Sequence, residues 1–278
     1  MNVAFGAVSI TLGLVYCALG AIAVAEVVRD YRTRGVSKFG LAFAAMAASC
    51  GPHHIIHGVH SIEGYDTNNL MFLSVLIGLP AGVTFILLRV ETMTGRRGDR
   101  FVTGTPAWLV AAPLVFAGAA GLLVGGEIVE IGLGHPITWS AFLPNAFVVV
   151  TYSMVGMLLL RTQLRRRVDE GGWSLSGLSL GAIFPTCALM HLVYALGARG
   201  DAHIAPADLF GVPASAYFLW VVHGLYRQAI VDWNRRPIVG TPRRAARPAP
   251  WQARPGGVRG SSAPTRPSST SPTPPLPC

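Results

Sequence analysis

Long apolar stretches alternate with short polar segments along the first 234 residues of the chain. A helix that crosses a bilayer needs about 20 predominantly apolar residues. Stretches of that kind predict seven membrane-spanning helices, over residues 5–28, 39–61, 69–90, 105–126, 139–160, 174–197 and 208–230. No strand-like alternation of apolar and polar residues competes with them. We therefore expect an all-α fold, a polytopic integral membrane protein with seven transmembrane helices.

The charged residues in the connecting segments predict how these helices are oriented. Basic residues follow the first, third, fifth and last spans, and acidic residues follow the second and fourth spans and lie between the sixth and seventh. Because Lys and Arg concentrate in cytoplasmic loops, we expect the N-terminus outside and the C-terminus in the cytoplasm. The acidic segments would form an outer rim that raises the local concentration of cations. This rim comprises Glu63, Asp66, Glu127, Glu130, Asp201 and Asp208.

The composition supports a membrane protein and excludes several other classes. Hydrophobic residues make up 51% of the chain and charged residues 13%, whereas soluble proteins carry about 25% charged residues. This excludes a soluble enzyme, a disulfide-stapled secreted module and a compact nucleic-acid-binding domain. The abundance of Ala, Gly, Arg and Pro is typical of a high-GC bacterium, so we expect a multi-pass protein of the plasma membrane.

Residues 235–278 form a second region with a different composition. They hold eight arginines, eleven prolines and no acidic residue, and so carry most of the net charge of +9. Almost no apolar side chains are present to offset the chain entropy, so we expect a disordered cytoplasmic tail after a transmembrane domain over 1–234. This tail either contacts anionic lipid or a cytoplasmic protein, or stays solvated without a specific partner.

The end of the second span carries the strongest chemical signal. Four histidines lie within eight residues there: His53, His54, His57 and His60. Ionisable residues inside a membrane helix are costly and by default functional. At about 100° per residue, three of the four fall on one stripe of the helix together with Met46 and Cys50, while His54 lies at its edge.

The sixth span carries a shorter stripe of the same kind, with Cys187, His191 and Tyr194 at i, i+4 and i+7 and Met190 beside them. At a rise of about 1.5 Å per residue, His57 lies about 27 Å from the start of its span and His191 about 26 Å from the start of its own. The two histidines therefore share one height near the outer face. They form one site only if the second and sixth spans are neighbours.

Neutral imidazole is a good ligand for zinc, copper and haem iron, and thiol or thioether groups suit copper in particular. We therefore expect a metal or haem site near the outer face. The candidate ligands are His53, His57 and His191, then His60, with Cys50 and Met190 as additional soft ligands. The alternatives are a polar cavity or proton relay without metal, with His223 of the last span as its inner member, and structural histidines hydrogen-bonded to carbonyl groups.

Three classes of function follow from these alternatives. The first is a metal- or haem-dependent sensor or redox protein, the second a transporter of a small solute, metal ion or proton, and the third a membrane scaffold acting through its basic tail. An oxygen-using or hydrolytic enzyme stays open, because histidines with a free metal position can activate water. The only lysine of the chain, Lys38, precedes the second span, which excludes a retinal Schiff base in the last span.

Two segments resemble a known family of bacterial membrane sensors. One is Ile56-His57-Gly-Val-His60, followed by Tyr65, and the other is Met190-His191-Leu-Val-Tyr194. They resemble the MHYT type of sensor domain, whose helices carry Met-His-Tyr-Thr-like motifs near the outer face. The resemblance implies copper binding and sensing of a diatomic gas, carried here by His57, His191 and His60.

Overall fold

The computed structural model describes residues 2–64, 69–104, 107–134, 136–197 and 206–227. These residues form seven helices and two short strands. In chain order the elements are α1 (Asn2–Arg34), α2 (Lys38–Ile62), α3 (Asn69–Met93), β1 (Phe101–Thr103), α4 (Ala107–Gly132), α5 (Trp139–Glu170), β2 (Gly172–Ser174), α6 (Leu175–Leu196) and α7 (Pro206–Arg227). Each predicted span falls on one of these helices, so the expectation of an all-α fold is confirmed for the described residues.

Six of the described helices, α1, α2, α3, α5, α6 and α7, are long and apolar enough to cross a membrane. The predicted span over 105–126 coincides with α4, which is not among these six. The count of seven spans and their orientation therefore stay predictions. The tail over 235–278 lies outside the described residues.

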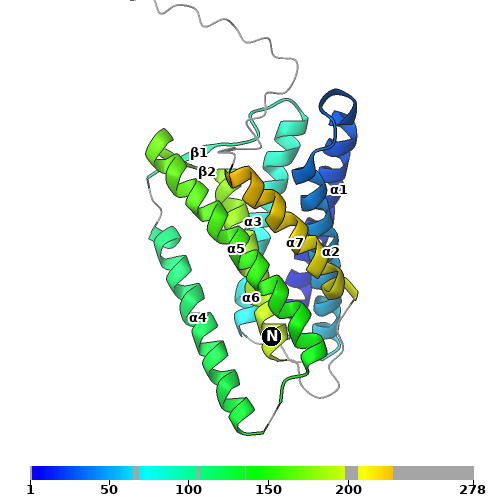
Figure 1. Ribbon diagram of the computed structural model, residues 1–278, viewed down its shortest axis with the longest axis vertical. Helices are drawn as coiled ribbons and strands as arrows, with labels where there is room; N and C mark the ends of the chain where they lie inside the picture. Colours follow the sequence, from blue (N-terminus) through cyan, green and yellow to red (C-terminus); the bar gives the residue numbers. More distant parts are fainter. Residues whose placement is uncertain (1, 65–68, 105–106, 135, 198–205, 228–278) are drawn as a thin grey trace, which may run out of the picture. The chain divides into compact units, whose positions relative to one another are not determined.

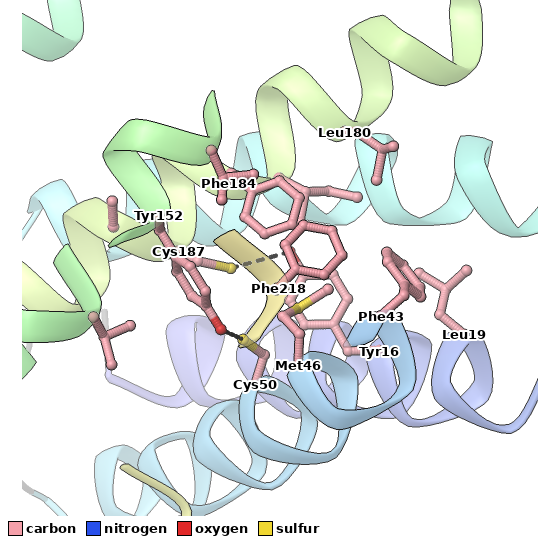
Figure 2. Close-up of a cluster of buried hydrophobic side chains, with 14 of the residues drawn as sticks. Tyr16, Leu19, Phe43, Met46, Cys50, Tyr152, Leu180, Phe184, Cys187 and Phe218 are labelled. Carbon is pink, nitrogen blue, oxygen red and sulfur yellow. Dashed lines mark hydrogen bonds between the residues drawn. The ribbon is translucent and has the colours of Figure 1, made fainter. Parts of the chain in front are cut away.

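The same six helices pack as a closed ring. α1 packs on α2, α2 on α7, α7 on α5, α5 on α6, α6 on α3, and α3 returns to α1, while α4 contacts α6. Figure 1 shows α4 at the edge of the helical bundle. The interior of the ring is an apolar core rich in aromatic rings. Figure 2 shows Phe43, Phe184 and Phe218 in this core, with the Phe184 and Phe218 ring centroids 5.0 Å apart. Stacking of this kind adds to the burial of apolar surface.

Glycines allow α1 and α2 to lie close together. A Cβ atom on Gly58 would lie 2.8 Å from the carbonyl oxygen of Gly6, and one on Gly13 would lie 2.7 Å from that of Gly51. Small residues let the backbones of membrane helices approach in this way. At about 100° per residue, the stripe of histidines lies nearly opposite these glycines on α2. Because the glycines face α1, the histidines point into the ring.

A small antiparallel sheet, which the sequence did not predict, joins the segments that follow α3 and α5. β1 pairs with β2 through three residues on each strand, too few to show an alternating pattern. The Asp99 carboxylate next to β1 accepts hydrogen bonds from the Ser174 hydroxyl at 2.7 Å and the Ser176 backbone N–H at 3.0 Å. Since the first N–H groups of a helix lack partners within it, these bonds fix the start of α6.

A buried ion pair joins α1 and α3. The Arg89 guanidinium donates to the Glu26 carboxylate, and both side chains are at most 11% exposed. A charge buried in this way needs its partner, because desolvation would otherwise be costly.

Candidate metal centre

Three ionisable side chains from three helices meet inside the ring: His53 of α2, His191 of α6 and Asp208 of α7. His53 Nδ1 forms a hydrogen bond with the Asp208 carboxylate, and the His53 and His191 rings stack with their centroids 4.4 Å apart. One ligand atom of each residue lies within 4.8 Å of those of the other two. All three residues are at most 3% exposed. We call this group the His–Asp cluster.

The ends of the helices bring the cluster together. His53 lies nine residues before the end of α2, about 14 Å along the helix, and His191 lies five residues before the end of α6. Asp208 lies in the first turn of α7, where the free N–H groups and the helix dipole stabilise a carboxylate. The Ser49 hydroxyl donates to the Ala207 carbonyl at 2.8 Å, which ties α2 to the same turn of α7.

Each of the two imidazoles has one nitrogen held by an acceptor. Asp208 holds Nδ1 of His53, and Asn145 Oδ1 lies 2.6 Å from Nδ1 of His191. The Asn145 amide in turn donates to the Ala141 carbonyl at 3.0 Å, so its oxygen is directed at His191. With Nδ1 protonated, Nε2 of each ring carries the lone pair, and that of His53 is buried without a hydrogen-bond partner. Histidines that bind metals usually have this arrangement, with one nitrogen held by a carboxylate or carbonyl and the other free for the ion.

Two further polar groups lie beside the cluster. His57 Nε2 is 3.8 Å from the second oxygen of Asp208, and the Tyr194 ring stacks on His57 with centroids 3.7 Å apart. Among the described residues, His53 Nε2, His57 Nε2 and the Tyr194 hydroxyl are buried and have no hydrogen-bond partner. Buried polar atoms without a partner are costly. Three of them on rings in mutual contact indicate that the place accommodates a ligand.

The structure brings together three of the residues singled out from the sequence, His53, His57 and His191. His60 is exposed at the margin, with its ring 6.2 Å from that of His57. His54 points toward α1, where the Ser9 hydroxyl donates to its backbone carbonyl at 2.9 Å.

The two soft candidate ligands lie in the apolar core. The Cys50 thiol is 3.0 Å from the Tyr152 hydroxyl, and Met190 is buried among apolar side chains. Neither residue belongs to the His–Asp cluster of the described residues.

Two members of the site were missed by sequence reasoning. The sequence predicts Asp208 in the acidic outer rim, whereas the structure buries it against His53. Its position at the start of an apolar stretch was the available signal, because it opens the last span. Asn145 carried no such signal, since a single amide in an apolar helix has no partner that can be identified from the sequence.

Fold and site together define an all-helical protein with six helices able to cross a membrane and a buried His–Asp cluster among three of them. Comparison with family models, with curated proteins and with solved structures finds no match to this chain. The resemblance to MHYT-type sensor domains therefore rests on its short motifs.

Proposed function

We propose that this protein is a seven-span plasma-membrane protein that binds one transition-metal ion at His53, His191 and Asp208 and acts in sensing or redox chemistry. In the predicted orientation the ion lies near the outer face. The observation that supports the proposal most strongly is the unpartnered, buried Nε2 of His53, beside a second imidazole whose Nδ1 is also held by an acceptor.

The donor atoms favour copper or zinc as the metal. Imidazole nitrogens with a carboxylate oxygen suit Zn²⁺ and Cu²⁺, and His57 stands beside the cluster as a fourth ligand. Haem is disfavoured because the His53 and His191 rings stack at 4.4 Å and Tyr194 covers His57 at 3.7 Å. A porphyrin would have to separate these rings.

The surroundings of the cluster favour binding over transport. Along α2 and α6, residues that precede His53 and His191, such as Phe43 and Phe184, belong to the apolar core. Figure 2 shows both rings in this core together with Phe218. His223, the inner member of the expected relay, lines a separate, open apolar groove of about 430 Å³ between α5 and α7. The alternative of a scaffold depends on the tail, which lies outside the described residues.

Elemental analysis by mass spectrometry of the detergent-purified full-length chain tests the proposal. The wild type is compared with His53→Ala and His191→Ala, and with His223→Ala as the control histidine outside the cluster. We expect close to one ion per chain in the wild type and the control, and loss of the ion in the two cluster variants. Each variant is first shown by size-exclusion chromatography and circular dichroism to be folded. Metal-free wild type from metal-replete cells, purified without chelator, overturns the proposal.

A further inference from the structure

The open apolar groove between α5 and α7 is separate from the His–Asp cluster. Its lining includes Phe147 and Leu158 of α5 and Ala216 and Trp220 of α7. Phe147 and Leu158 are about 17 Å apart along α5, and one leaflet of a bilayer has a hydrocarbon layer about 15 Å thick. The groove therefore has the length of an acyl chain in one leaflet.

Two arginines lie one helical turn beyond the end of this groove. On α5, Arg161 follows the lining residue Leu158 by three positions. On α7, Tyr226 follows the lining residue His223 by the same spacing. The guanidinium groups of Arg161 and Arg165 lie 5.4 Å and 5.3 Å from the centre of the Tyr226 ring. Because residues three apart share one helix face, the groove leads to this pair of guanidinium groups.

The arginine pair lies at the level expected for lipid headgroups. Arg161 is about 33 Å along α5 from Trp139, the first residue of the helix, and the hydrocarbon core of a bilayer is about 30 Å thick. Trp is common at membrane interfaces, and Trp139 is 63% exposed. With Trp139 at one interface, Arg161 and Arg165 lie at the other, which is the cytoplasmic one in the predicted orientation.

The charges at this end of the groove favour an anion. Like charges four residues apart on a helix repel each other, and the ion pairs of the described residues include neither Arg161 nor Arg165. A third cation, the Lys38 ammonium, lies 5.3 Å from the centre of the Trp220 ring in the groove. Guanidinium groups bind phosphate through paired hydrogen bonds. An apolar groove that ends at such cations matches a lipid with an anionic phosphate group.

We propose that the groove between α5 and α7 binds one anionic phospholipid, with an acyl chain along the groove and the headgroup phosphate at Arg161 and Arg165. The inference rests on the membrane location in the proposed function and not on its metal. The acyl chain covers the exposed side of Trp220. The phosphate offsets the repulsion between the two guanidinium groups and so stabilises the contact between the ends of α5 and α7.

Native mass spectrometry of the detergent-purified, delipidated full-length chain tests this site. The chain is titrated with phosphatidylglycerol, which is anionic, or with phosphatidylcholine, which has no net charge, and the bound lipids are counted. Each basic residue beside an anionic lipid raises affinity about fivefold, so we expect the first phosphatidylglycerol to bind about 10–30-fold more tightly than phosphatidylcholine. Inorganic phosphate in large excess should not displace it, because phosphate lacks the acyl chain.

Matched charge variants separate this site from general attraction to a basic protein. Arg161→Gln/Arg165→Gln should lose the preference for phosphatidylglycerol. Arg96→Gln/Arg97→Gln makes the same change in charge at two exposed arginines after α3 and should keep the preference. The tail is present in every sample, so its own lipid contacts do not affect the comparison.

A second pair of variants tests the acyl chain. Ala216→Phe fills the groove without a change in charge and should weaken binding of phosphatidylglycerol. Ala18→Phe, at an exposed position of α1, should not. Each variant is first shown by size-exclusion chromatography and circular dichroism to be folded.

Four results would overturn the lipid site. Equal binding of the two lipids, or an equal loss of preference in Arg96→Gln/Arg97→Gln, identifies general attraction between lipid and protein. Displacement by inorganic phosphate identifies a phosphate site without an acyl chain. Unchanged binding in Ala216→Phe shows that the groove is not occupied.

The outcomes also distinguish this inference from the proposed function. Wild type that binds phosphatidylglycerol as expected but contains no metal overturns the metal centre alone. Wild type that holds its metal but shows no preference between the lipids overturns the lipid site alone. A chain absent from the membrane fraction of its cells overturns the membrane location, and the lipid site with it.

Discussion

Replacement of Asp208 by asparagine tests whether this carboxylate only holds His53 in place or also coordinates the proposed ion. Asp208 accepts from His53 Nδ1–H, and its other oxygen lies 3.8 Å from His57 Nε2. Asparagine has the same size, so packing in the first turn of α7 is kept. Its neutral amide holds the imidazole less strongly than a carboxylate, because hydrogen bonds with a charged acceptor are stronger.

The expected loss of metal affinity depends on the role of the carboxylate. Removal of a group that orients a metal-binding histidine lowers metal affinity about 10–100-fold, which corresponds to about 1.4–2.8 kcal/mol of binding free energy. A larger loss would indicate that an Asp208 oxygen is itself a ligand of the ion. The size of the effect therefore separates an orienting carboxylate from a coordinating one.

The assay is Zn²⁺ competition against a chromophoric chelator on the purified wild type and Asp208→Asn at one pH. Asp30→Asn is the matched control, because Asp30 is a partly exposed acid of α1 that pairs with Arg29 at 3.2 Å. We expect weaker binding only in Asp208→Asn. Equal affinity of wild type and Asp208→Asn would refute the assignment of Asp208 to the metal centre.

Two further predictions concern the stability of the ring, measured by thermal unfolding in detergent. Gly58→Leu should lower stability by about 1–3 kcal/mol through overpacking, because a Cβ atom there would lie 2.8 Å from the Gly6 carbonyl oxygen. Gly125→Leu on α4, where a Cβ atom meets open space, should change little, and equal effects would contradict the close contact. Glu26→Gln should cost about 3–5 kcal/mol by leaving the Arg89 charge buried, and Glu26→Gln/Arg89→Met should recover part of it. No recovery in the double variant would contradict this account.

The helices of this protein could be predicted from the sequence because their determinants are local. Apolar stretches long enough to cross a bilayer must satisfy their backbone hydrogen bonds internally, and the helix is the single-segment solution. The seven predicted spans accordingly coincide with α1 to α7. The β1–β2 pair was not predicted, because pairing of residues such as Val102 and Trp173 across 71 positions depends on where α4 and α5 return the chain.

The candidate site could likewise be predicted from the sequence only in part. The sequence by itself determined that His53 and His57 share one face of α2 and that His191 lies at a similar height on α6, because helical periodicity and rise fix both properties. Only the tertiary structure decided that these faces meet and that Asp208 is buried against His53, 155 positions away in the chain. The physical reason is that contact between helices depends on how their surfaces pack together, as at the glycines between α1 and α2, and no single helix carries that information.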